Sequence, residues 1–190
     1  LIPCVAGELM GNEIKKLDMA LETPVRPCLA VLGGVKVDDS IQVADNMLRG
    51  GIADELWPTG GVANLLLDLA GIDIGDINRD FLKNELGDHW KTTVAKARTL
   101  MDDYGSKIHL PVDVAANIEG NRVDLKVKDL PIEAPLFDLG IESILYLSAA
   151  IKRAGTIVLN GPAGVYEITD FAFGTVEMLN ACAESPGYAV

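Results

Sequence analysis

Short apolar runs alternate along this chain with stretches of helical periodicity, and glycine-rich turns separate the two. The runs cover residues 28–32, 55–57, 108–114, 156–159 and 188–190. Strands that are apolar at nearly every position are typical of a parallel sheet buried on both faces, with helices as crossovers. The alternation therefore predicts a Rossmann-like α/β fold with three layers and a mostly parallel sheet.

Rows of apolar residues at helical spacing supply the predicted crossovers. They lie within residues 10–21, 90–104, 144–151 and 171–182. Residues 62–70 are apolar on nearly every side, which predicts a buried helix. One segment departs from this plan. Residues 122–128 alternate polar and apolar after a turn, which predicts a small, half-exposed β-hairpin at an edge.

Composition narrows the class of protein. The chain has 190 residues and a formal net charge of −12. That length fits one domain, and that charge argues against a nucleic-acid partner. There is no apolar run of the length that spans a bilayer, so no membrane segment is expected. Cys4, Cys28 and Cys182 are odd in number and have no metal-site spacing, so we interpret them as reduced thiols of a cytoplasmic protein.

In a parallel sheet of this kind, ligands bind beyond the carboxyl ends of the strands. The first turn at such a place is Gly33-Gly34-Val35-Lys36, between a predicted strand and a helix. Paired glycines allow close backbone approach, the start of a helix favours an anion, and a lysine adds a charge suited to phosphate. A tight turn followed by a solvated lysine is the alternative interpretation. Asp38 and Asp39, which follow, suit the helix dipole but repel a phosphate.

Two further turns follow predicted strands. Thr59-Gly60-Gly61 offers a flat wall for an adenine ring, or close helix-to-sheet packing. Residues 160–167 are too rich in glycine and proline for a helix or strand; there Asn160 can donate to a phosphate and Glu167 can accept from a ribose. Residues 137–142 indicate a turn into a helix. His89 and His109 have no motif partner, which argues against a catalytic histidine.

These segments, taken in order, resemble the phosphoglycerate kinase family, with an archaeal character. The resemblance rests on residues 6–10, 26–37, 110–113, 137–140, 160–167 and 171–175. It implies ATP-dependent, reversible phosphoryl transfer to the carboxylate of 3-phosphoglycerate, a step of glycolysis and gluconeogenesis. It also implies two domains, of which this sequence matches only the one that holds Mg-ATP or Mg-ADP, with phosphoglycerate bound by the other.

The resemblance divides the chain into an interdomain connector helix, residues 1–23, and a nucleotide-binding domain, residues 24–190. It implies that Lys36 contacts the nucleotide phosphates and the transferred group, and is catalytic. It places glycines along the adenosine site, Asn160 near the phosphates, Pro162 and Val165 against the nucleoside, and Glu167 on the ribose. The glycines are Gly33, Gly34, Gly60, Gly61 and Gly140.

The chain departs from the family pattern at three places. Ser40 stands where many members carry a second lysine, and Thr59 where a third glycine is usual. The family's later triple-glycine turn, which carries a metal-binding Asp in many members, would follow Val190, so the magnesium ligand is expected outside this chain. We interpret the sequence as a piece truncated at both ends, able to self-associate, of a protein that is monomeric when intact.

Two alternatives stay open on the sequence alone. One is a different Rossmann-like enzyme, an oxidoreductase or a methyltransferase, although the G-x-G-x-x-G fingerprint is missing after the first strand. The other is a folded piece with no binding activity.

Overall fold

A four-stranded parallel sheet forms the centre of the computed structural model, which describes residues 7–190. Its strands are β1 (Cys28–Leu32), β2 (Glu55–Pro58), β6 (Thr156–Asn160) and β7 (Tyr188–Ala189), in the order β2-β1-β6-β7. β1 pairs in parallel with both β2 and β6, and β6 with β7. The predicted parallel core of an α/β fold is confirmed.

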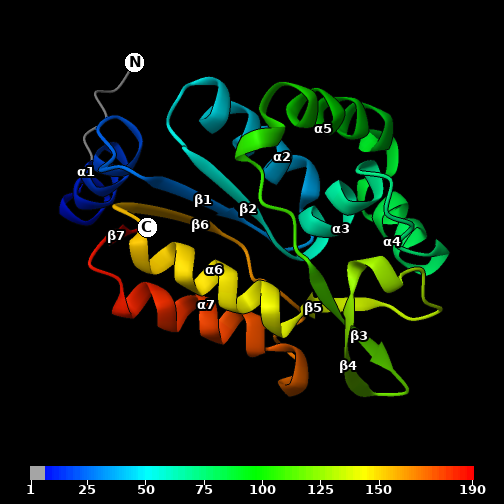
Figure 1. The fold of residues 1–190 in the computed structure, drawn as a ribbon. Helices are drawn as coiled ribbons and strands as arrows, with labels where there is room; N and C mark the ends of the chain where they lie inside the picture. The colour runs from blue at the N-terminus through cyan, green and yellow to red at the C-terminus, as the bar shows by residue number, and fades with distance from the viewer. Residues whose placement is uncertain (1–6) are drawn as a thin grey trace.

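Strand β1 is buried at every position because helices cover both faces of the sheet. Leu29 and Val31 pack into a cluster with α6 (Ile141–Arg153) and α7 (Phe173–Glu184). Cys28, Ala30 and Leu32 pack on the opposite face, against α2 (Val37–Arg49) and Leu100 of α5 (Trp90–Tyr104). Figure 1 shows the resulting three layers, with α6 and α7 on one side of the sheet and α2 and α5 on the other.

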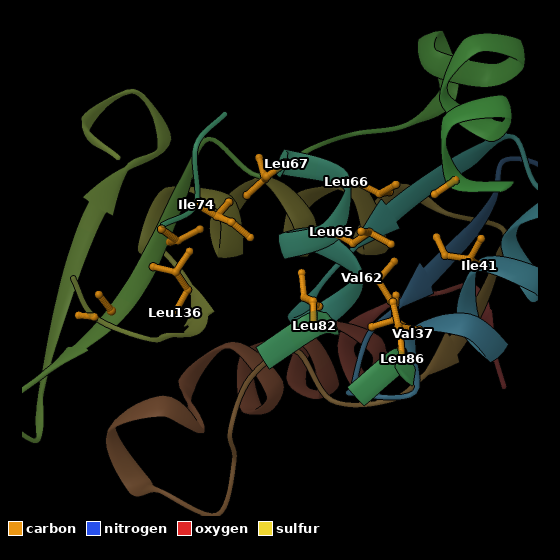
Figure 2. Close-up of a cluster of buried hydrophobic side chains, with 14 residues drawn as sticks. Val37, Ile41, Val62, Leu65, Leu66, Leu67, Ile74, Leu82, Leu86 and Leu136 are labelled. Carbon is orange, nitrogen blue, oxygen red and sulfur yellow. The ribbon is translucent and has the colours of Figure 1, made fainter. Parts of the chain in front are cut away.

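The apolar segment after β2 forms α3 (Gly60–Leu69), the predicted buried helix. Figure 2 shows Val62 and Leu65 of α3 close to Val37 and Ile41 of α2, while Leu82 of the neighbouring helix lies close by. That neighbour, α4 (Asp76–Leu86), has no counterpart among the sequence predictions. It extends the core beyond the edge of the parallel sheet.

A second, antiparallel sheet lies beside the first, in the order β4-β3-β5. Its strands are β3 (Asp113–Ile118), β4 (Asn121–Lys126) and β5 (Leu136–Leu139). The predicted hairpin is confirmed as β3 and β4. Two other predictions are wrong. The predicted strand 108–114 is a single bridge, Ile108 to Leu56, and only its last two residues belong to a strand, β3. Residues 137–139, expected in a turn, belong to β5, which pairs with β3.

The helix predicted before Pro24 is α1 (Glu8–Leu21), of which only Ala20 is buried. Residues 1–6, including Cys4 and the start of the first family-like segment, lie outside the described residues. No described helix combines the length and the apolar character that crossing a membrane requires. Short 3₁₀ turns complete the fold: η1 (Gly87–His89), η2 (Gly105–Lys107), η3 (Val127–Asp129) and η4 (Thr169–Phe171).

Candidate functional site

The three turns predicted at the strand ends meet at one edge of the parallel sheet, and backbone hydrogen bonds join them. Gly33 N–H donates to the Asn160 carbonyl at 2.7 Å, and Gly34 N–H to the Pro162 carbonyl at 2.9 Å. The third turn joins them through Gly60 N–H, 3.0 Å from the Ala163 carbonyl. Since β1, β2 and β6 are parallel neighbours, their carboxyl ends bring these turns together.

Gly33 is required at its position because there is no space for a side chain. A Cβ there would overlap the Thr59 hydroxyl and the carbonyl oxygen of Pro162. Thr59 is itself buried, and its Oγ1 has no hydrogen-bond partner among residues 7–190. The Thr59 side chain therefore fills the space beside Gly33 and the Pro162 carbonyl.

Beside these turns lies an open pocket of about 690 Å³, a size typical of small-molecule sites. One wall is backbone, from Gly34, Gly60 and Gly61. Other lining residues come from α4, from the segment that leads into β5 and from the loop after β6. The lining is completed by Val35, Asn64, Ile77, Asn78, Phe81, Pro135, Leu136, Phe137, Pro162, Gly164, Val165, Tyr166 and Glu167.

Six of the ten predicted site residues line this pocket: Gly34, Gly60, Gly61, Pro162, Val165 and Glu167. Gly33 and Asn160 lie just behind it, joined by the hydrogen bond between their turns. Lys36 is exposed at the N-cap of α2 and does not belong to the lining. Gly140 is buried at the N-cap of α6, where a Cβ would overlap the Asp113 carboxylate, and it lies outside the lining too.

Ser40, at the place where the resemblance implies a second lysine, is buried beneath the turns. Its hydroxyl lies 3.4 Å from the Gly33 carbonyl and 3.5 Å from the Asn160 amide nitrogen. Both contacts are long for hydrogen bonds. Ser40 therefore packs under the site, and Lys36 is the lysine of this turn that reaches solvent.

The residues of α4 that line the pocket were not predicted from the sequence. Ile77 and Phe81 of α4 are 44% and 46% exposed, and both line the pocket. They lie four residues apart, on one helical face, while Leu82 and Leu86 face the core. The signal in the sequence that could have indicated this part of the pocket was a pair of apolar residues outside the core-facing side of a short, mostly polar helix. Phe137 was hidden in the segment taken for a turn.

The chemistry of the pocket suits a flat, largely apolar ligand with polar groups at its rim. Glycine backbone and the rings of Phe81 and Phe137 line it, and Glu167 supplies a carboxylate. No cluster of three or more His, Cys, Asp or Glu side chains suitable for a metal ion occurs within residues 7–190.

The model of the family described as phosphoglycerate kinase matches residues 1–190, the whole chain. The chain belongs to the phosphoglycerate kinase family. Phosphoglycerate kinases of Methanothermus fervidus and Methanothermobacter thermautotrophicus are 42% and 43% identical to it over 189 residues. Each match covers 100% of this chain and 45% of the relative, so the chain spans about half the length of these phosphoglycerate kinases.

Solved phosphoglycerate kinases share the fold described above. The Pyrococcus horikoshii enzyme superposes with a TM-score of 0.89 at 34% sequence identity, and the Coxiella burnetii enzyme with 0.77 at 32%. Both matches cover 97% of this chain and 46% of the other. The resemblance noted in the sequence is confirmed at the level of the family and the fold.

Proposed function

We propose that this chain binds ADP or ATP, as the magnesium complex, in the pocket beside the three turns. The supporting observation is that the residues expected from the family resemblance and the residues that line the pocket overlap. Six of the residues expected to contact nucleotide line one open pocket of suitable size. The glycine wall accepts the purine ring, and Glu167 accepts hydrogen bonds from the ribose hydroxyls. Lys36, at the start of α2, holds the phosphates as a point charge.

We propose further that, in a complete protein, this half serves reversible phosphoryl transfer between ATP and 3-phosphoglycerate. A substrate carboxylate is already ionised near neutral pH, so no side chain has to remove its proton. Catalysis then consists of positioning and of stabilising the charge of the moving phosphoryl group. Lys36 supplies one cation. The phosphoglycerate would bind residues outside this sequence, with α1 as the connector to them, in a cytoplasmic monomer.

The titration that tests this proposal uses Mg-ADP with the 190-residue chain, followed by calorimetry. We expect Glu167→Gln and Lys36→Met each to weaken binding about tenfold, because each removes one charge-assisted contact. The matched controls are Glu13→Gln on α1 and Lys91→Met on α5, which are exposed and lie outside the pocket. They should bind like the parent chain.

Two results would contradict the proposal. A chain shown by circular dichroism to be folded, yet without saturable ADP binding, would be a folded piece without binding activity. Equal weakening in the site variants and the controls would place the nucleotide elsewhere. Competition by NAD or S-adenosylmethionine at the concentrations at which ADP competes would instead favour a different Rossmann-like enzyme. The match of the whole chain to the family model argues against that alternative.

A further inference from the structure

Arg122 of β4 holds an unusually large set of hydrogen bonds for a residue on an edge strand. Its side chain is only 13% exposed. The guanidinium donates to Asp138 Oδ2 at 2.8 Å, to the Leu139 carbonyl at 2.7 Å and to the Asp170 carbonyl at 3.0 Å. Asp124 accepts two further hydrogen bonds, one from Nε and one from the nitrogen that also donates to Leu139. One side chain thus joins the hairpin, β5 and the loop that precedes α7.

Asp138, the carboxylate at the centre of this network, is completely buried. Besides Arg122 it accepts from Gly174 N–H in the first turn of α7, at 2.8 Å, and from Leu139 N–H at 2.9 Å. Gly164 and Gly174 pack so closely on it that a Cβ at either place would contact the carboxylate. The carboxylate therefore fixes both ends of the segment between these two glycines.

That segment carries part of the candidate nucleotide site. Val165, Tyr166 and Glu167 line the pocket, and all lie between the two glycines. The start of the segment is held by Val165 N–H, which donates to the Phe137 carbonyl at 2.8 Å. Its end is held by the contacts of Asp138 and Arg122 just described. Arg122 itself is not among the lining residues.

We infer that Arg122 is a positioning residue for the nucleotide site: by holding Asp138 and the Asp170 carbonyl together, it sets the place of Glu167. The inference rests on the proposed function, since Glu167 is taken to accept from the ribose. It goes beyond that function because Arg122 lies on the hairpin of the second sheet and contacts no ligand. The pocket and that hairpin are thereby coupled.

The planar fork of arginine is what the arrangement uses. The five hydrogen bonds of Arg122 use the five N–H groups of one guanidinium, whereas the ammonium of a lysine has only three. Arg122→Lys therefore keeps the charge beside Asp138 and gives up the carbonyls of Leu139 or Asp170. This variant separates positioning from the stability that the buried charge pair provides.

The test compares ADP with 2′,3′-dideoxy-ADP in the parent chain, Arg122→Lys, Glu167→Gln and the control Arg98→Lys, an exposed arginine of α5. In the parent we expect ADP to bind about threefold to tenfold more tightly than the dideoxy analogue, the contribution of one hydrogen bond. In Arg122→Lys and in Glu167→Gln that ratio should fall towards one, because the first displaces the acceptor and the second replaces a charged acceptor with a neutral one. Arg98→Lys should keep the parent ratio.

Hydrogen exchange of the unliganded proteins gives a second readout. In Arg122→Lys we expect faster exchange of the Val165 and Gly174 amides, with β1 amides unchanged. A general loss of stability would accelerate all of them and leave the ADP preference intact. An unchanged preference and unchanged exchange in a folded variant overturn the inference. If the parent fails to bind ADP, the proposed function falls, while the exchange result still decides whether Arg122 holds the loop.

Discussion

Asp138→Asn is expected to lower the free energy of unfolding by about 3–5 kcal/mol, the usual cost of removing one member of a buried ion pair. The guanidinium of Arg122 would lose its buried partner charge and keep only that of Asp124. One of the two acceptor oxygens of residue 138 would also become an NH₂ group that faces N–H donors. Burial raises the pKa of Asp138, while hydrogen bonds from Arg122 and from Gly174 N–H oppose that shift. The contacts of this carboxylate therefore offset only part of the cost of removing it from water.

Urea denaturation followed by circular dichroism measures the effect. The matched control is Asp80→Asn on α4, whose ion pair with Lys83 is exposed on both sides. Exposed pairs contribute about 1 kcal/mol or less. A loss in Asp138→Asn no larger than in Asp80→Asn would mean that the network around Asp138 does not support the fold.

Gly33→Ala is expected to lower the free energy of unfolding by about 1–3 kcal/mol through overpacking, more than any other added methyl group near the site. The added Cβ would meet a backbone carbonyl, that of Pro162, which moves only if a whole turn moves. The cost should therefore lie near the upper end of that range. ADP binding should weaken at the same time, because the Gly34 and Gly60 hydrogen bonds depend on the same spacing.

Gly105→Ala is the control for this substitution. Gly105 follows α5 with φ −52° and ψ −34°, a conformation that alanine adopts freely, and nothing lies within 4 Å of its added Cβ. That variant should be more stable than the parent by about 0.4–1 kcal/mol, since alanine restricts the unfolded chain. Equal stability of the two alanine variants would show that the turns around Gly33 can accommodate a methyl group, contrary to the spacing in the structure.

The parallel part of the fold was predictable because a strand buried on both faces has a continuous apolar sequence. A strand such as β1 has no solvent-facing position, so its sequence is apolar throughout. The glycine-rich turns were predictable for a related reason: only residues without a Cβ allow the approach seen at Gly33.

The antiparallel sheet and the outer wall of the site were harder to predict. β5 contains a buried aspartate, a residue that is normal in a cap or a turn. Its distant partners are Arg122, 16 residues away, and Gly174, 36 residues away. Ile77 and Phe81 lie off the core face of α4, and no local pattern states which partner they meet. Both failures concern contacts between distant segments, which periodicity within one element cannot report.

The hydrogen bonds that join the three turns run from peptide group to peptide group, and this has a consequence for evolution. A frame made of main-chain atoms does not depend on which side chains stand around it, provided that the few glycines are retained. Sequences can then drift far while the geometry of the site persists. The pair formed by this chain and the Pyrococcus horikoshii enzyme fits that expectation, with 34% of residues identical and a TM-score of 0.89. At such a site, selection acts mainly against substitutions that add a side chain at one of these glycines.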